Sequence, residues 1–208
     1  MWIKICGITR LSDAVAAARF GADAIGFIFA ESPRRISPEE AKKISLKVKS
    51  DIARVGVFVN SPLREVERIK AKCGLDLVQL HGEESADYCL ALGGEIIKAV
   101  KATSWEDIFN IPPYPCKALL LERKEAQVAE SDIHYFDWKL VRFMGYEKPV
   151  IVAGGLNPAN ISRVIKEARP YGVDVSSGIE ERPGVKSHAL MYEFIERARK
   201  TEYALTAG

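Results

Sequence analysis

The chain has 208 residues, of which 48% are hydrophobic and 28% are charged, enough for one large core or two small ones. Its 30 Lys and Arg nearly balance its 28 Asp and Glu, which argues against a general nucleic-acid binder. The apolar runs are far shorter than the ~20 residues that cross a bilayer, and no signal-like segment opens the sequence. We therefore expect a cytoplasmic protein with neither a membrane nor a nucleic acid as partner.

The cysteine and histidine content predicts neither a disulfide framework nor a metal centre. The four cysteines form no CxxC pair, and only three histidines are present, so a zinc site is not expected. We expect three of the four to be ordinary buried thiols: Cys73, Cys89 and Cys116.

Short β-branched runs alternate with helix-like segments along the chain. The first four strand–helix pairs are Trp2–Cys6 with Ser12–Phe20, Ala24–Phe29 with Pro38–Lys49, Arg54–Val59 with Ser61–Cys73, and Leu75–Leu80 with Ser85–Leu92. Ser37 before Pro38 is a helix-opening signal, because serine caps the first turn and proline fits the first helical position. The remaining segments are Glu95–Val100 with a weaker helix at Ser104–Phe109, Ala118–Glu122, Val150–Ala153 with Ala159–Ala168, and Val173–Ser176 with His188–Lys200.

The strands are continuous apolar runs, as expected when both faces of a parallel sheet are buried. Repeated strand–helix units give either an open doubly wound sheet or a closed barrel. Eight units in about 200 residues with short connections favour the (β/α)8 TIM barrel. We expect one barrel domain over residues 1–200 and a frayed tail over residues 201–208.

Two glycine-rich turns predict a phosphate site, because barrels bind ligands at the carboxyl ends of their strands and phosphate at the last two. Gly154 and Gly155 follow the seventh strand, and the run from Asp174 through Ser176, Ser177 and Gly178 ends the eighth. Glycine bares backbone N–H groups, and serine adds donors. Tight turns alone would also use glycine, but two such loops at the expected strands favour phosphate binding.

A thiol and a carboxylate stand at two other strand ends. Cys6 ends the first strand and Glu122 the sixth. Alone, Cys6 could be an inert buried residue and Glu122 simply the first residue of a loop. Together at the mouth of a barrel they suit paired proton transfers across one small substrate, provided that neighbours lower the pKa of the thiol from about 8.5.

Three further polar side chains are candidates for substrate contacts. Arg34, beside Arg35 in the loop after the second strand, could hold a carboxylate with two hydrogen bonds or form a solvated basic pair. Gln79 and His81 end the fourth strand. His81 lacks a partner histidine or cysteine, which argues for a substrate-positioning or structural role rather than a metal role.

Seven motifs occur in a fixed order: Lys4-Ile5-Cys6-Gly7-Ile8-Thr9, Phe27 to Arg34, Val57-Phe58-Val59-Asn60, Val78-Gln79-Leu80-His81-Gly82, Phe136-Asp137-Trp138, Ala153-Gly154-Gly155-Leu156, and Val173 to Glu180 followed by Pro183-Gly184-Val185-Lys186. In this order they resemble phosphoribosylanthranilate isomerase, an enzyme family of tryptophan biosynthesis. The resemblance covers nearly the whole chain.

The resemblance implies a (β/α)8 barrel that converts N-(5-phosphoribosyl)anthranilate to 1-(2-carboxyphenylamino)-1-deoxyribulose 5-phosphate by an Amadori rearrangement. It implies no metal or organic cofactor. Carried over, the general base is Cys6, which removes the proton from C2 of the ribose. Arg34 lies near the anthranilate carboxylate, and Gly154, Gly155, Ser177 and Gly178 hold the phosphate. The family's general acid is an aspartate at the end of strand six.

The sequence departs from the family at that acid, where it has Glu122, and the glycines of the following loop are missing. Glutamate keeps the acid chemistry, but its extra methylene moves the carboxyl by about 1 Å, which can cost ~10²-fold in rate. Asp132 or His134 could instead supply the proton, and the altered loop over residues 123–135 could lower activity or shift specificity. Near the end, the usual Lys-Asp is Lys186-Ser187.

Two other functions fit parts of this pattern. A phosphate-binding barrel that has lost catalysis would keep the phosphate loops while the acid loop drifts. A related sugar-phosphate enzyme, such as the histidine-pathway isomerase or indole-glycerol-phosphate synthase, would need paired aspartates or a catalytic lysine that the strand ends do not convincingly offer. Monomer and homodimer are both compatible with the sequence.

Overall fold

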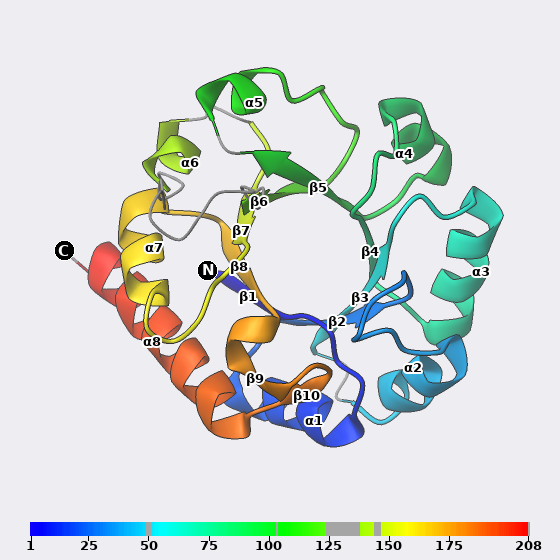
Figure 1. Cartoon of the computed structure of the whole chain (residues 1–208), viewed down its shortest axis with the longest axis horizontal. Helices are drawn as coiled ribbons and strands as arrows, with labels where there is room; N and C mark the ends of the chain where they lie inside the picture. Colours follow the sequence, from blue (N-terminus) through cyan, green and yellow to red (C-terminus); the bar gives the residue numbers. More distant parts are fainter. Residues whose placement is uncertain (49–50, 103, 124–137, 144–146, 208) are drawn as a thin grey trace.

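The computed structural model describes residues 1–48, 51–102, 104–123, 138–143 and 147–207. Its parallel strands close into a ring in sequence order, β1 to β8, with β8 paired to β1 and the helices outside (Figure 1). The strands are β1 (Trp2–Ile5), β2 (Ala24–Ile28), β3 (Ala53–Phe58), β4 (Leu77–Leu80), β5 (Ile96–Ala102), β6 (Ala118–Arg123), β7 (Val150–Ala153) and β8 (Gly172–Val175). The predicted (β/α)8 barrel is confirmed.

The helices alternate with the strands, as the sequence pattern predicts. They are α1 (Leu11–Phe20), α2 (Pro38–Ser45), α3 (Leu63–Cys73), α4 (Ala86–Leu92), α5 (Trp105–Phe109), α6 (Lys139–Phe143), α7 (Ile161–Ala168) and α8 (His188–Thr206). Ser37 caps α2 in a reciprocal capping box with Glu40, which satisfies backbone donors at both residues. Helices α4 and α5 begin one residue inside the predicted bounds, because Ser85 and Ser104 are N-caps whose side chains accept from backbone N–H groups of the first turn.

Alternation along each strand sorts the buried residues into two layers. One set packs between strands and helices, and a smaller set fills the inside of the barrel: Ala24, Val55, Ile97, Ala99, Ala118, Leu120, Ile151 and Ala153. Because successive side chains point to opposite faces, a residue two positions beyond an inner one also points inward. This parity decides which side chains reach the mouth of the barrel.

The end of the chain differs from the expectation of a frayed tail. Helix α8 continues to Thr206 rather than ending at Lys200. Thr201 is buried, and its hydroxyl lies 3.0 Å from the Ser162 hydroxyl of α7. Leu205 packs against the core. The last turns are therefore held by packing on α7, which the small polar residues of this segment do not reveal in sequence.

A short antiparallel hairpin after β8 was not expected from the sequence. It consists of β9 (Glu180–Arg182) and β10 (Val185–Lys186), preceded by the 3-10 turn η2 (Ser177–Ile179). Gly184 turns the hairpin with a φ of +79°, a conformation that glycine adopts without strain. In Figure 1 the hairpin lies near α1, over the part of the ring formed by β1 and β2.

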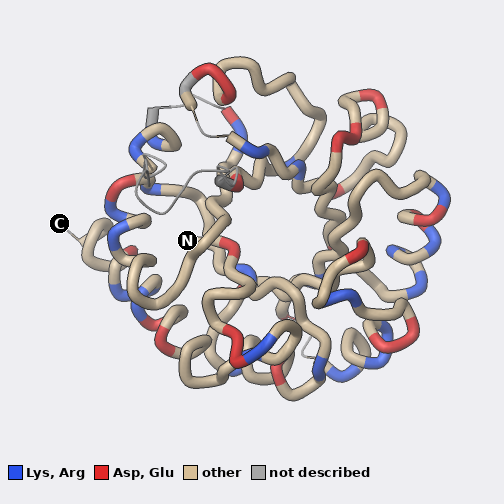
Figure 2. The backbone as a smooth tube through the Cα atoms, viewed as in Figure 1, with Lys and Arg blue, Asp and Glu red and all other residues tan. Residues whose placement is uncertain are grey.

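Charged residues of both signs are spread over the outer helices and loops, and a smaller number lie on the strands (Figure 2). Across the described residues, no helix is both long and apolar enough to cross a membrane.

Candidate active site

A cavity of about 910 Å³ lies at the carboxyl ends of the strands, the end where parallel barrels bind ligands. Ten of the predicted site residues line it: Cys6, Arg34, Gln79, His81, Glu122, Gly154, Gly155, Asp174, Ser176 and Ser177. Gly178 is packed behind them, where an added Cβ would meet the Leu156 carbonyl oxygen at 1.9 Å. The strand-end rule therefore brings residues from distant parts of the sequence to one place.

Cys6 extends the inward-facing series of β1. Its backbone N–H donates to the Val175 carbonyl at 2.8 Å, which fixes it against β8. Burial raises the pKa of the Cys6 thiol above its ordinary value, and the nearby Lys4 ammonium only partly opposes this. The lowered pKa that would make Cys6 an ionised base in the free protein is therefore absent, and the thiol form predominates near neutral pH.

Lys4 and Asp174 form a buried ion pair beside the thiol. The Lys4 Nζ atom donates to Asp174 Oδ2 at 2.9 Å, and the two side chains are 0% and 8% exposed. Burial raises the pKa of Asp174 despite the opposing charge of Lys4. Asp174 thus differs from the other predicted phosphate contacts, because a carboxylate offers no donor to a phosphate.

Glu122 and His81 are neighbours on the wall of the cavity. The Glu122 Oε2 and His81 Nε2 atoms are 2.8 Å apart, and His81 Nδ1 lies 2.9 Å from the amide nitrogen of Gln79. Burial alone would raise the pKa of Glu122, but the hydrogen bond and charge of His81, with Lys101 and Lys4, hold that pKa below its usual value.

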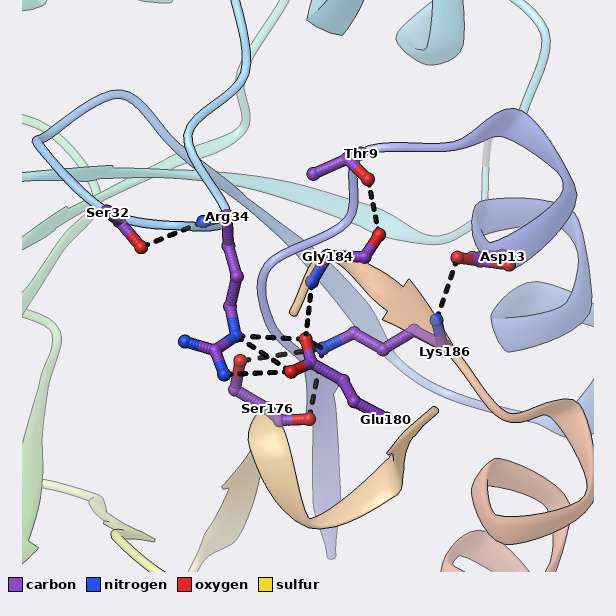
Figure 3. A network of polar contacts seen from close by, with 8 residues as sticks. All are labelled: Thr9, Asp13, Ser32, Arg34, Ser176, Glu180, Gly184 and Lys186. Atoms are coloured by element: carbon purple, nitrogen blue, oxygen red, sulfur yellow. Dashed lines mark hydrogen bonds and ion pairs between the residues drawn. The ribbon is translucent and has the colours of Figure 1, made fainter. Parts of the chain in front are cut away.

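Arg34 belongs to a cluster at the rim of the cavity, not to a solvated basic pair (Figure 3). Its Nε and Nη2 atoms donate to the Glu180 carboxylate at 2.8–3.0 Å. Lys186 donates to the same carboxylate at 2.8 Å and to the Ser176 carbonyl at 3.0 Å. Within the described residues, no acceptor contacts Arg34 Nη1, and this leaves one edge of the guanidinium for a ligand in the cavity.

The two glycine-rich loops lie side by side, because they follow the neighbouring strands β7 and β8. Gly154 and Gly155 have φ values of +94° and +66°, which a residue with a side chain would adopt only under strain. They turn the chain away from β7 and toward α7. In the segment that leads into α7, the Asn157 side chain accepts hydrogen bonds from the backbone N–H groups of Ala159 and Asn160. Ser176 and Ser177, at the end of β8, line the same cavity. Hydroxyls and bared backbone N–H groups suit a phosphate.

Sequence reasoning missed one charged cavity residue, Lys101, and the carboxylate partner of Arg34, Glu180. Lys101 lines the cavity because β5 runs past Val100 and residues 97, 99 and 101 share the inward face. Parity from the buried Ile97 and Ala99 would have found it. Lys98 has the opposite parity and lies on the outer side, paired with Glu84 at 3.0 Å.

Two of the predicted alternatives for the acid, Asp132 and His134, lie outside the described residues. Among the residues that are described, no group of three or more His, Cys, Asp or Glu side chains is arranged to hold a metal ion. The prediction that the reaction needs no metal stays a prediction.

Known proteins similar to this chain include many N-(5'-phosphoribosyl)anthranilate isomerases. A family model described as N-(5'-phosphoribosyl)anthranilate isomerase matches residues 3–197. The isomerase of Desulforamulus reducens is 44% identical over 206 residues, with 99% of each chain covered. That of Thermotoga neapolitana is 43% identical over 201 residues, covering 95% of this chain and 98% of the relative.

Solved structures show the same relationship in three dimensions. The crystal structure of phosphoribosyl anthranilate isomerase in complex with reduced 1-(o-carboxyphenylamino)-1-deoxyribulose 5-phosphate superposes with a TM-score of 0.86, at 37% identity over 96% of this chain and 99% of that one. The enzyme from Thermus thermophilus gives 0.83, at 38% identity, 96% and 99%. This chain therefore belongs to the N-(5'-phosphoribosyl)anthranilate isomerase family, and it is an isomerase of tryptophan biosynthesis.

Proposed function

We propose that Cys6 and Glu122 carry the proton transfers by which this chain converts N-(5-phosphoribosyl)anthranilate to 1-(2-carboxyphenylamino)-1-deoxyribulose 5-phosphate. One observation carries the assignment: a thiol and a carboxyl line the same cavity, together with two glycine-rich loops that suit a phosphate.

The reaction needs a proton at one atom and the loss of a proton at another. Glu122 protonates the ring oxygen, the bond from C1 to that oxygen breaks, and the nitrogen lone pair forms a C=N⁺ bond. The Cys6 thiolate then removes the proton from C2, a C1=C2 bond forms, and the electrons of the C=N⁺ bond return to nitrogen. The resulting enol becomes the ketone by losing its O–H proton and gaining one at C1, so the net change in protons is zero.

Lys4 supports Cys6 as the base because its ammonium favours the thiolate over the thiol. The ion pair between Lys4 and Asp174 weakens this effect, because the Asp174 carboxylate partly neutralises the lysine charge. A modest fraction of thiolate at neutral pH is compatible with catalysis, because a thiolate whose pKa is raised by burial is the stronger base.

The remaining predicted residues position the substrate. The unpaired Nη1 edge of Arg34 suits the anthranilate carboxylate, and Gln79 lies along the wall between this rim and Glu122. Gly154, Gly155, Ser176, Ser177 and Gly178 form the phosphate end.

Two variants test the roles of Cys6 and Glu122. We expect Cys6→Ala and Glu122→Gln each to lower kcat by at least ~10³-fold while the Kd of the reduced product analogue changes less than about threefold. Cys89→Ala is the matched control, because Cys89 is a buried free thiol on α4 that does not line the cavity. Full turnover in either site variant would refute its assignment.

The proposal also covers the cellular location and the oligomeric state of the protein. The four cysteines are free and amino-acid biosynthesis is intracellular work, which supports a cytoplasmic location. One solved structure is of monomers generated from the dimeric phosphoribosylanthranilate isomerase of Thermotoga maritima, and this chain would be a monomer or a homodimer. Sedimentation equilibrium at assay concentration distinguishes the two.

A further inference from the structure

His81 stands between Glu122 and Gln79 in a row of three polar side chains on one wall of the cavity. His81 and Glu122 are partly exposed, at 21% and 29%, and both line the cavity. Gln79 is 1% exposed. A proton can pass between the imidazole and the carboxyl, because His81 Nε2 and Glu122 Oε2 are 2.8 Å apart. The Gln79 amide does not carry a proton, but it lies 2.9 Å from the other ring nitrogen of His81.

Glu122 by itself is poorly suited to be the acid. Burial favours its protonated form, but His81, Lys101 and Lys4 outweigh burial and hold the pKa of Glu122 below its usual value. An ionised carboxylate has no proton for the ring oxygen of the substrate. Among the described residues, the titratable side chain hydrogen-bonded to Glu122 is His81, and an imidazole can hold a proton for the carboxylate.

Gln79 is arranged so that it can follow a change of charge on His81. In the orientation observed, its amide nitrogen faces Nδ1, and this requires Nδ1 to be an acceptor in a neutral ring. Its Oε1 atom is buried and has no partner in the described structure. Rotating the amide by 180° therefore breaks no other hydrogen bond, and it presents an acceptor to Nδ1–H of a protonated ring.

From this geometry we infer that His81 stores the proton that Glu122 delivers, so that the acid of this enzyme is the His81–Glu122 pair. The inference rests on the proposed role of Glu122. With the ring protonated, Nδ1–H donates to Gln79 Oε1 and Nε2–H donates to Glu122. The Nε2 proton of His81 passes to Glu122 while Glu122 protonates the ring oxygen of the substrate. The pair thereby loses one proton, which is the proton that the ring oxygen gains.

Charged groups from three other strands lie close enough to act on this pair. Lys101 comes from β5, Lys4 from β1 and Asp174 from β8. The two lysines favour loss of the proton, whereas Asp174 favours its retention, because its carboxylate lies close enough to interact with both His81 and Glu122.

The kinetic test uses His81→Gln, whose amide can still donate to Glu122 but holds no dissociable proton. We expect kcat to fall by about 10²-fold near neutral pH, with KM changed less than about threefold. The limb of the pH–rate profile that belongs to the acid should move to lower pH, because a lone carboxyl loses its proton about two pH units below an imidazole.

His188→Gln is the matched control. His188 also contacts a carboxylate, with its Nε2 2.9 Å from Asp13 Oδ1, but neither residue lines the cavity. We expect its kcat and pH profile to match those of the unmodified enzyme. A His81→Gln profile that is lowered equally at every pH, with unmoved limbs, would show a merely structural role and overturn the inference.

A second measurement needs no variant at the site. The chain has three histidines, so nitrogen NMR of ¹⁵N-histidine-labelled enzyme can follow each ring through a pH titration. We expect His81 to lose its proton at the pH of the limb assigned to the acid. A ring that stays neutral throughout the active pH range would refute the proton store, whereas an active Glu122→Gln enzyme would refute the role of Glu122 itself.

Discussion

Glu122 is one methylene longer than the aspartate that the family uses, and its extra reach has a partner. The Glu122 carboxylate lies 2.8 Å from Nε2 of His81, so a hydrogen bond fixes the end of the longer side chain. The departure from the family pattern is thus consistent with a retained acid whose environment has changed, rather than with a drifting loop residue.

Glu122→Asp tests whether that reach matters. Shortening the side chain withdraws the carboxyl by about 1 Å from His81, and a displacement of this size costs up to ~10²-fold in rate. We expect kcat to fall by 10- to 10²-fold, even though aspartate is the usual residue of the family. Steady-state kinetics with saturating substrate measure this, and a kcat equal to or above that of the unmodified chain would contradict the prediction.

Cys6 supplies a second prediction because burial raises the pKa of its thiol. Only the thiolate reacts with iodoacetamide. We expect inactivation by iodoacetamide to be slow near neutral pH and to keep accelerating above pH ~9, beyond the range of an ordinary thiol. The reduced product analogue should protect the enzyme. An inactivation rate that levels off below pH ~8 would show that Lys4 outweighs burial.

Among the elements, the β9–β10 hairpin orients a cavity residue, although none of its own residues is among those that line the cavity. Glu180 lies at the start of β9. Its carboxylate accepts hydrogen bonds from two nitrogen atoms of Arg34, which is 146 residues earlier in the chain. Thr9 donates to the Gly184 carbonyl, and Lys186 binds the same Glu180 carboxylate. The hairpin therefore fixes the direction of the Arg34 guanidinium (Figure 3).

The Glu180 cluster predicts how stability changes with pH. Burial alone would raise the pKa of Glu180, but Arg34 and Lys186 lower it below the ordinary value of about 4.5. A depressed pKa in the folded state contributes stability above pH ~4.5, and this contribution is lost as the pH falls through the folded pKa.

Glu180→Gln should remove that contribution. We expect the variant to be less stable than the unmodified chain by about 3 kcal/mol at pH 7, because Lys186 loses its buried partner. The difference should shrink as the pH falls below 4.5. Urea unfolding between pH 7 and pH 3 measures both quantities, and a difference that stays constant across this range would contradict the linkage.

Strand parity explains how much of the site can be predicted from sequence. Cys6 and Glu122 were predictable because they end apolar runs, and parity would have added Lys101. Glu180 was not predictable as the partner of Arg34, since the contact depends on how the hairpin crosses to the β2 loop. The hydrogen bond between His81 and Glu122 likewise depends on distances across the barrel, which a linear pattern does not contain.

At the scale of the whole molecule, ring closure explains why the fold was easier to predict than its ends. Each strand is buried on both faces, so it leaves a continuous apolar run that is visible in sequence. Helix α8 instead closes the ring of helices by packing on α1 and α7, and the residues that do so after Lys200 are few and separated by polar positions. Their contribution comes from contact with distant segments and not from local pattern.

Removal of residues 201–208 tests the role of the last turns of α8. The truncation deletes the contact between Thr201 and Ser162 and exposes the surface that Leu205 covers. We expect a loss of about 2 kcal/mol, which for a chain of this size lowers Tm by ~4–8 °C. Because these residues lie outside the cavity, kcat at 25 °C should stay the same. A frayed tail would instead leave Tm unchanged, so calorimetry of the truncated and full-length chains separates packing from fraying.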